Sequence, residues 1–174
     1  APESTHVLDR YILSRLGELA RDITDGMERY ELDVASRPIL HFVDDLSTWY
    51  VRRSRDRFKG EDVADAAAAR ATLRHALRKL ALLMAPFPPF YAAHLYRSLR
   101  QANDPESVHL TPWPQAQRAD KKVLHAMRTT RDVVSNALQA RAKERIRVRQ
   151  PLQKLTVHGT ALSDEYLALV RDEV

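Results

Sequence analysis

The chain of 174 residues contains no cysteine, which excludes disulfide bonds and metal sites built from thiolates. Only four glycines occur, and no two of them are close enough in sequence to form a phosphate-binding loop of the Walker or dinucleotide type. The seven histidines are scattered, and no pair has the four-residue spacing that places two metal ligands on one helix face. The Gly-x-Ser-x-Gly motif of hydrolases is also missing. We therefore expect no catalytic residues, no metal site and no cofactor in this chain.

Long hydrophobic runs are missing as well. The sequence has neither a stretch of 18 apolar residues nor a signal peptide, so we expect no membrane association and predict a cytoplasmic location. Hydrophobic residues make up 44% of the chain, which is enough for a buried core. The net charge of +5 favours a polyanionic partner only weakly.

Helical periodicity dominates the first 145 residues and predicts an all-α fold. Apolar residues recur every three or four positions in segments that we expect to form helices over about 7–30, 33–57, 61–84, 88–99 and 120–145. In the second segment, the spacing predicts a buried stripe of Ile39, Val43, Leu46 and Tyr50. Residues 101–119 contain three prolines and are expected to form a loop with a short extended piece at 108–110.

The pattern changes after residue 145. Residues 146–149 alternate between apolar residues and arginine, which predicts a short strand, and residues 155–157 are a second candidate strand. Ser163 is a candidate cap for a last helix. We therefore predict a helical domain over residues 1–145 and a short α/β piece over residues 146–174.

Five cations follow an aromatic pair near the end of the second predicted helix. The pair is Trp49 and Tyr50, and the cations, which fall within eight residues, are Arg52, Arg53, Arg55, Arg57 and Lys59. Arginine offers planar donors to phosphates and base edges, and aromatic rings offer stacking faces, so this combination suits an RNA ligand.

The direction of these arginines raises a question about their partners. If the helix advances by 100° per residue, Arg53 and Arg57 lie on the same arc as the apolar stripe. Because an unpaired buried charge is unfavourable, either acidic side chains of this chain meet the arc or it projects beyond the core and meets a ligand. Trp49 lies four residues before Arg53, which permits a cation–π contact. The residues alone favour RNA binding and a solvated surface about equally.

A second basic cluster raises the weight of RNA binding. Its five cations fall within nine residues, and they are Arg141, Lys143, Arg145, Arg147 and Arg149. Two separate clusters on a helical scaffold could follow a phosphate backbone. The alternative is a solubilising helix end that leads into a solvated edge strand.

Several motifs carry a resemblance to a known family. They are, in chain order, LDRYILSRL at 8–16, DDLSTWYVRRSRDRF at 44–58, LMAPFPPF at 83–90, SVHL at 107–110 with Trp113-Pro114, and VRQPL at 148–152. These segments resemble the anticodon-binding domain of isoleucyl-tRNA synthetases, which are class I aminoacyl-tRNA synthetases. The corner motif at 83–90 is shared with the valyl and leucyl branches, whereas the arginine motif and VRQPL point to the isoleucyl branch.

The resemblance implies a fold, a partner and a place in a longer enzyme. It implies an antiparallel helical bundle over residues 1–145 and the start of a C-terminal junction region over 146–174. It also implies binding of the tRNA anticodon stem-loop by part of an enzyme that attaches isoleucine to its tRNA with ATP. The two catalytic signatures of class I are missing, so we expect the chain to be inactive alone. ATP, and zinc as a further candidate, would belong to the remainder of a monomeric polypeptide, whose catalytic domain is an expected partner.

The expected RNA contacts follow from the resemblance and the charge pattern together. They are Trp49, Arg52, Arg53, Arg55 and Arg57, with Arg147, Arg149 and Gln150 in second rank. Three positions depart from the family pattern: tryptophan is usual at Lys59, a small or flexible residue is frequent near Arg145, and Pro38 interrupts a helix that is commonly continuous. Two alternatives remain, a valyl- or leucyl-type anticodon-binding domain and a helical protein-interaction module with an arginine-rich face.

Overall fold

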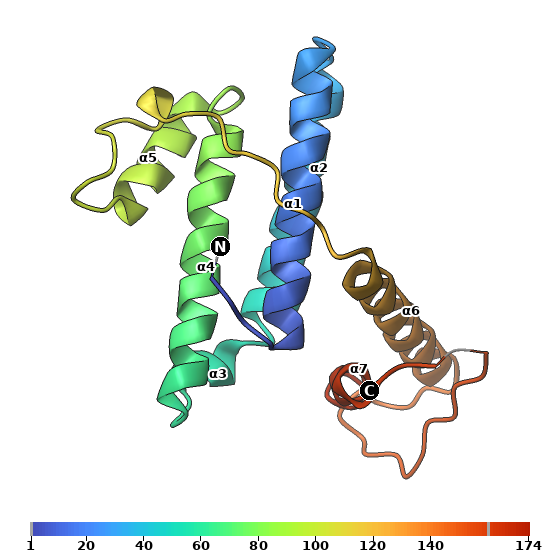
Figure 1. Ribbon diagram of the computed structural model, residues 1–174. Coiled ribbons are helices and arrows are strands. Elements are labelled where there is room, and N and C mark those ends of the chain that lie inside the picture. Colours follow the sequence, from blue (N-terminus) through green and yellow to red (C-terminus); the bar gives the residue numbers. More distant parts are fainter. Residues whose placement is uncertain (1, 160) are drawn as a thin grey trace. The chain divides into compact units, whose positions relative to one another are not determined.

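The computed structural model describes residues 2–159 and 161–174, and every regular element in these ranges is helical (Figure 1). The predicted all-α class is therefore confirmed. Internal contacts divide the chain into two compact units, residues 1–120 and residues 121–174. The predicted domain boundary at residue 145 stays a prediction.

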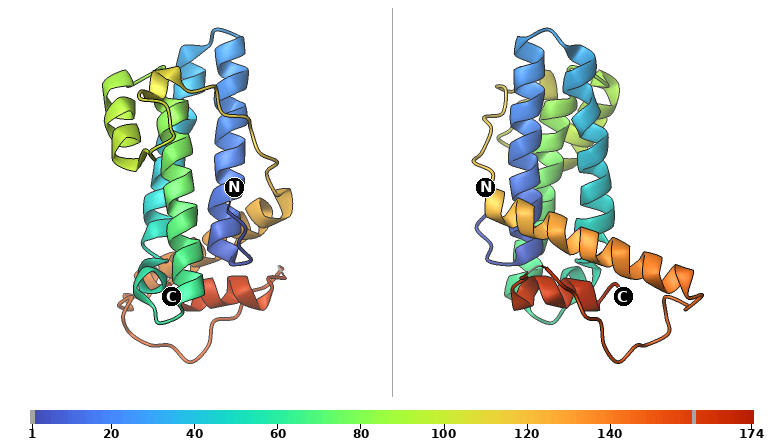
Figure 2. Two further views of the ribbon diagram at one scale, coloured as in Figure 1. Left: turned by 60° about the vertical axis from the view of Figure 1, so that its left-hand side comes forward. Right: turned by 90° about the vertical axis from the view of Figure 1, so that its right-hand side faces the viewer.

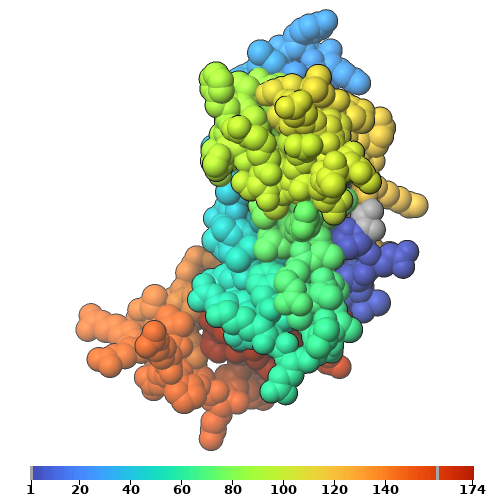
Figure 3. All heavy atoms as spheres, turned by 90° about the vertical axis from the view of Figure 1, so that its left-hand side faces the viewer, coloured from blue at the N-terminus to red at the C-terminus, as the bar shows by residue number. Residues whose placement is uncertain are grey.

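Unit 1 contains most of the helices. They are α1 (Val7–Glu28), α2 (Leu32–Asp44), the π-helix η1 (Asp45–Val51), α3 (Arg55–Lys59), α4 (Val63–Met84), α5 (Pro89–Leu99) and the 3-10 helix η2 (Val108–Leu110). Helix α1 packs against α2 and α4, and α5 packs against α4 (Figure 2). Figure 3 shows a face of this unit on which α5 and the beginning of α4 lie at the surface. The extended piece expected at 108–110 is thus wrong, because these residues form the single turn of η2.

The core of unit 1 lies between α1, the α2–η1 segment and α4. The apolar stripe expected on α1 is buried at Ile12, Leu16, Leu19 and Ile23. Helix α4 contributes small side chains, among them Ala69, Thr72 and Ala76, which let the helices approach closely. In α2 and η1 the stripe runs through Ile39, Phe42 and Leu46, and Val43 is 41% exposed, so its predicted place in the stripe is wrong. The Phe42 side chain faces the core, and the next residue, Val43, is rotated from it by about 100° around the helix axis.

The turn between α1 and α2 explains why α1 ends at Glu28. The N–H groups of Tyr30 and Glu31 donate to the carbonyls of Met27 and Gly26 at 3.0 and 2.9 Å, which is the Schellman pattern of a helix C-terminus. Tyr30 takes the left-handed conformation of that motif, with φ of 59°. A Cβ on Gly26 would lie 2.8 Å from the Cβ of Ala35, so the glycine permits the close approach of α1 and α2.

Residues 111–120 form an irregular strap along α1. The indole Nε1 of Trp113 donates to Thr24 Oγ1 at 2.9 Å, and the N–H of Asp120 donates to the buried Ser14 hydroxyl at 3.3 Å. Between these points, a Cβ on Gly17 would lie only 2.5 Å from the carbonyl oxygen of Gln117. A side chain at residue 17 would therefore displace the strap.

Unit 2 contains α6 (Lys121–Lys143) and α7 (Asp164–Arg171). The predicted strands at 146–149 and 155–157 are wrong, since neither segment is extended and paired, so the short α/β piece does not exist in the part of the unit that the structure describes. The alternation at 146–149 covers too few residues to form a strand without a neighbour to pair with. Instead, Gln150 donates its N–H to the carbonyl of Arg147 at 3.0 Å and closes a turn.

Candidate nucleic-acid interface

The basic cluster of unit 1 follows a π-helical turn. We call residues 49–57 the arginine segment; it includes the end of η1, a turn at 52–54 and the start of α3. The N–H of Arg52 donates to the carbonyl of Ser47, five residues earlier, at 3.1 Å. The α-helical spacing returns when Ser54 donates to the carbonyl of Tyr50 at 2.9 Å. π-Helical turns are rare in proteins, and those that occur often lie at functional sites. This local geometry is therefore a first indication of a binding surface.

Trp49 and Arg53 form a contact pair within the segment. The guanidinium carbon of Arg53 lies 5.8 Å from the centroid of the Trp49 ring, so the predicted cation–π contact is confirmed. Both side chains are half-buried. The contact restricts the Arg53 guanidinium and leaves part of the pair open to solvent.

Arg52 and Arg55 are exposed on the segment. The Nε of Arg52 donates to the carbonyl of Thr48 at 3.1 Å, one turn earlier, which orients the guanidinium along the helix. Lys59 is exposed at the end of α3. These side chains supply positive charge at a surface that an anionic ligand can reach.

Arg57 points into the chain and meets two carboxylates. Its Nη1 and Nη2 donate to the two oxygens of Asp9 at 3.0 and 2.9 Å, and its Nε and Nη2 donate to the two oxygens of Asp65 at 2.8 and 2.6 Å. The Arg57 side chain is only 11% exposed. Burial alone would lower the pKa of Arg57, but the hydrogen bonds to Asp65 and Asp9 raise it above its usual value. At this position, acidic partners within the chain satisfy the inward-facing cation.

Asp9 is the centre of a buried polar network. Its side chain is 0% exposed, and it accepts hydrogen bonds from Arg57, from Ser4 Oγ at 2.6 Å and from the Tyr50 hydroxyl at 2.7 Å. Burial alone would raise the pKa of Asp9, but these hydrogen bonds hold it below its usual value. Burial and the Asp9 carboxylate raise the pKa of Tyr50, so the phenol keeps its proton and remains a donor. The network joins α1, η1, α3 and α4.

A second ion pair connects α1 to the first residue of η1. The Nε of Arg15 donates to the carboxylate of Asp45 at 2.8 Å, and the Asp45 side chain is 6% exposed. Arg15 also pairs with Glu18 on its own helix. The pairing fixes the start of the π-helix to α1.

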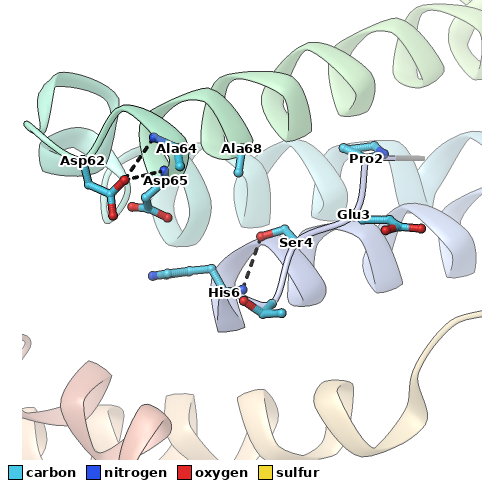
Figure 4. A pocket seen from close by; sticks show the side chains of 9 residues that line it. Pro2, Glu3, Ser4, His6, Asp62, Ala64, Asp65 and Ala68 are labelled. Carbon is cyan, nitrogen blue, oxygen red and sulfur yellow. Dashed lines mark hydrogen bonds between the residues drawn. The ribbon is translucent and has the colours of Figure 1, made fainter.

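One edge of the network faces an open hollow of about 720 Å³ (Figure 4). Figure 4 shows Ser4 and His6 on the segment before α1, with Asp62 and Asp65 facing them from the start of α4. Asp62 caps α4 by accepting from the N–H groups of Ala64 and Asp65 at 3.0 and 3.1 Å. The hollow thus gives solvent access to the Asp65 side of the ion pairs while Asp9 stays buried.

The second basic cluster belongs to unit 2 and has a different construction. Arg141 is 6% exposed, and its Nη1 donates to the carbonyls of Arg147 and Gln150 at 3.0 and 2.9 Å. Arg145 adopts φ of 56° at the end of α6, where its N–H and that of Ile146 complete a second Schellman motif. Buried Arg141 therefore shapes a turn on which Arg147, Arg149 and Gln150 are exposed.

Comparison with known proteins decides the family. A family model described as the anticodon-binding domain of tRNA ligase matches residues 9–156. The chain belongs to this family. It is 44% identical to the isoleucine--tRNA ligase of Thermobifida fusca over 94% of the chain and 16% of that protein. It is 42% identical to the enzyme of the same name from Thermus thermophilus over 99% of the chain and 17% of that protein. The resemblance seen in the sequence is thereby confirmed.

The anticodon-binding domain spans about a sixth of the length of the curated relatives that it matches. Within the residues that the structure describes, no helix is long and apolar enough to cross a membrane. No group of three side chains among these residues could hold a metal ion, and the four glycines form no phosphate loop.

The anticodon-binding domain brings only part of the predicted set together. Trp49, Arg52, Arg53 and Arg55 share one segment, while Arg57 is engaged by the chain's own carboxylates, and its role as an RNA contact stays a prediction. The three second-rank candidates lie in the other unit. Sequence reasoning missed Asp9, Arg15 and Asp65 as ion-pair residues, and it gave Arg141 no structural role. A signal existed for Asp9, which precedes buried Ile12 by three residues and so lies on the core face of α1.

Proposed function

We propose that this chain binds the anticodon stem-loop of an isoleucine tRNA, as the anticodon-binding domain of an isoleucine--tRNA ligase. The observation that carries the proposal is the arginine segment, where exposed Arg52 and Arg55 flank a guanidinium stacked on an indole. Family membership and the isoleucine--tRNA ligase relatives support it.

The side chains of the segment suit two kinds of RNA contact. Arg52 and Arg55 are exposed point contacts for phosphates, which position an RNA without reading its sequence. The Trp49–Arg53 pair offers a flat face on which an unpaired loop base can stack, a contact that contributes roughly 1–3 kcal/mol per base. In unit 2, Arg147 and Arg149 are further phosphate contacts, and the Gln150 amide can bond a base edge.

The remainder of the activity belongs to a longer polypeptide. In this proposal the full-length enzyme attaches isoleucine to tRNA in the cytoplasm with ATP, acts as a monomer, and supplies ATP and any zinc site from outside this chain. The chain alone binds RNA without turnover.

A competition experiment tests the proposal. Labelled isoleucine tRNA is bound to the 174-residue chain, and unlabelled isoleucine, valine and leucine tRNAs compete for it in a fluorescence anisotropy titration. We expect isoleucine tRNA to displace the label at the lowest concentration. Best displacement by valine or leucine tRNA would assign the chain to that branch. Equal displacement by all three, or displacement by acidic peptides only, would contradict anticodon recognition.

The contact set is tested by Arg52→Ala. Loss of one phosphate contact should weaken binding and lower the slope of log affinity against log salt by about one unit. Arg97→Ala is the matched control, because Arg97 is an exposed arginine of the same unit on α5. Equal effects of the two substitutions would show that only overall charge matters.

A further inference from the structure

Helix α1 holds both sides of the arginine segment through ion pairs of opposite polarity. Before the segment, Arg15 of α1 donates to Asp45 at 2.8 Å, and near its end, Asp9 of α1 accepts from Arg57 at 2.9 and 3.0 Å. The two carboxylate residues are 4% and 0% exposed. Because neither can reach water without unpacking, the backbone between residues 45 and 57 is fixed to α1 at two points.

We propose that these two ion pairs position the arginine segment for RNA, and that Arg57 is a positioning residue and not an RNA contact. The inference rests on the proposed function and adds residues to it that no charge pattern assigned. The π-helical turn between the anchors sets the directions of half-buried Trp49, exposed Arg52 and half-buried Arg53, so a shift at either anchor changes the surface offered to the ligand.

The donor geometry of Arg57 supports this role. All three of its nitrogens already donate to Asp9 or Asp65, and the side chain is 11% exposed. The remaining N–H of Nη1 donates to the buried Ser54 hydroxyl at 3.5 Å, so a phosphate could bind only by displacing one of these partners. A lysine at this position would keep the charge but could not reproduce the planar fork that joins the two carboxylates.

Replacing Asp9 by a neutral residue distinguishes a positioning role from a simple effect of charge on RNA binding. Asp9→Asn removes one negative charge from the chain, so charge alone would strengthen the binding of an RNA. Positioning predicts the opposite, because the neutral amide can accept only one of the two Arg57 hydrogen bonds and no longer pairs with its charge. Asp22→Asn is the matched control, since it makes the same change of charge at an exposed residue of the same helix.

The experiment measures the affinity of each variant of the 174-residue chain for an RNA hairpin with the isoleucine anticodon stem and loop. We expect Asp9→Asn and Arg57→Lys to weaken binding by about three- to thirtyfold, a range typical for residues that act through others. Asp22→Asn should leave affinity unchanged or slightly higher. Amide hydrogen exchange without RNA should become faster across residues 45–57 in the first two variants only.

Two results would overturn the inference: a folded Asp9→Asn chain that binds the hairpin as tightly as the unaltered chain, or an Arg57→Lys chain that keeps full affinity. The lysine variant decides the matter if Asp9→Asn fails to fold. Failure of the proposed function gives a different result, because the unaltered chain itself would then not bind the hairpin, while hydrogen exchange would still report whether the anchors hold the segment.

Discussion

Each of the two basic clusters contains five cations, but the chain supports the two clusters in different ways. In the arginine segment of unit 1, Arg57 pairs with two carboxylates, and its neighbours Arg52 and Arg55 are exposed. In unit 2, buried Arg141 donates to two backbone carbonyls, and the exposed arginines lie on the turn that it shapes. In each cluster one arginine is structural and at least two others are exposed. A run of cations in a sequence is therefore not a list of ligand contacts.

The difference lies in what remains if the structural arginine is lost. Removal of Arg57 would leave the buried Asp9 carboxylate without its cationic partner, whereas removal of Arg141 would leave two neutral carbonyls that belong to exposed residues. Buried unpaired charge is far less favourable than a carbonyl that can turn to water. The first cluster should therefore depend on its internal arginine more strongly than the second.

The largest effect is expected for Arg57→Ala. It should lower the free energy of unfolding by about 3–5 kcal/mol, the range for breaking a buried ion pair from one side. Urea denaturation followed by circular dichroism measures the change. Arg55→Ala, two residues away and exposed, should stay within about 0.5 kcal/mol of the unaltered chain. Similar losses for both variants would contradict the structural role of Arg57.

A smaller effect is expected for Arg141→Met, which keeps much of the packing and removes the hydrogen bonds to Arg147 and Gln150. The free energy of unfolding of unit 2 should fall by about 1–2 kcal/mol, and amide exchange at residues 146–150 should become faster. Lys143→Met is the control, because Lys143 is exposed near the end of the same helix. If Arg141→Met destabilised the chain as much as Arg57→Ala, the contrast between the clusters would be lost.

Acid should weaken the ion pairs of the first cluster and leave the hydrogen bonds of Arg141 in the second cluster unaffected. Hydrogen bonds and charge from Arg57 lower the pKa of Asp65, as they do that of Asp9 against its burial, so both carboxylates stabilise the fold fully above their unfolded pKa of about 4. That contribution is lost as the pH falls through the lower pKa values of the folded state. The carbonyl partners of Arg141 do not titrate.

The acid effect is measured as the change in unfolding free energy between pH 6 and pH 3. Asp65→Asn should reduce this pH-dependent change. The reduction should be smaller than the loss of unfolding free energy expected for Arg141→Met, because Asp65 is partly open to solvent. Arg141→Met, whose carbonyl partners do not titrate, should leave the pH-dependent change unaltered. The assignment fails if Asp65→Asn and Arg141→Met respond to acid alike.

The smallest effect is expected for Arg145→Gly. Arg145 has φ of 56° at the end of α6, a conformation that glycine adopts without steric strain. The substitution should raise the free energy of unfolding by about 0.5–1 kcal/mol. Tyr30→Gly should act similarly in unit 1, where the same cap ends α1 with φ of 59°. Loss of stability in both variants would show that side-chain contacts outweigh the strain.

Apolar spacing predicted much of the fold of unit 1. The stripe on α1 and the first residues of α4 and α5 follow from local patterns that involve only neighbouring residues, such as the cap at Asp62 and the proline at the start of α5. The contact between Trp49 and Arg53 was also predictable, because their spacing of four residues suffices to bring the side chains together.

The remaining features depend on partners far apart in the sequence. Asp9 and Arg57 are separated by 48 residues, and no local pattern indicates which carboxylate meets which arginine. The π-helix was not predictable from apolar spacing, because Leu46 and Tyr50 are buried at an interval that an α-helix also gives. The predicted strand at 146–149 failed because two alternating pairs of residues do not specify a pairing partner.

The π-helical turn is a place where the segment can accept a change of length. A π-helical turn holds about one residue more than an α-helical turn, so a single-residue deletion within 45–51 would let the turn tighten to α geometry while the later side chains keep nearly the same direction. Arg57 could then still reach both carboxylates, and the basic surface would survive the loss of one codon.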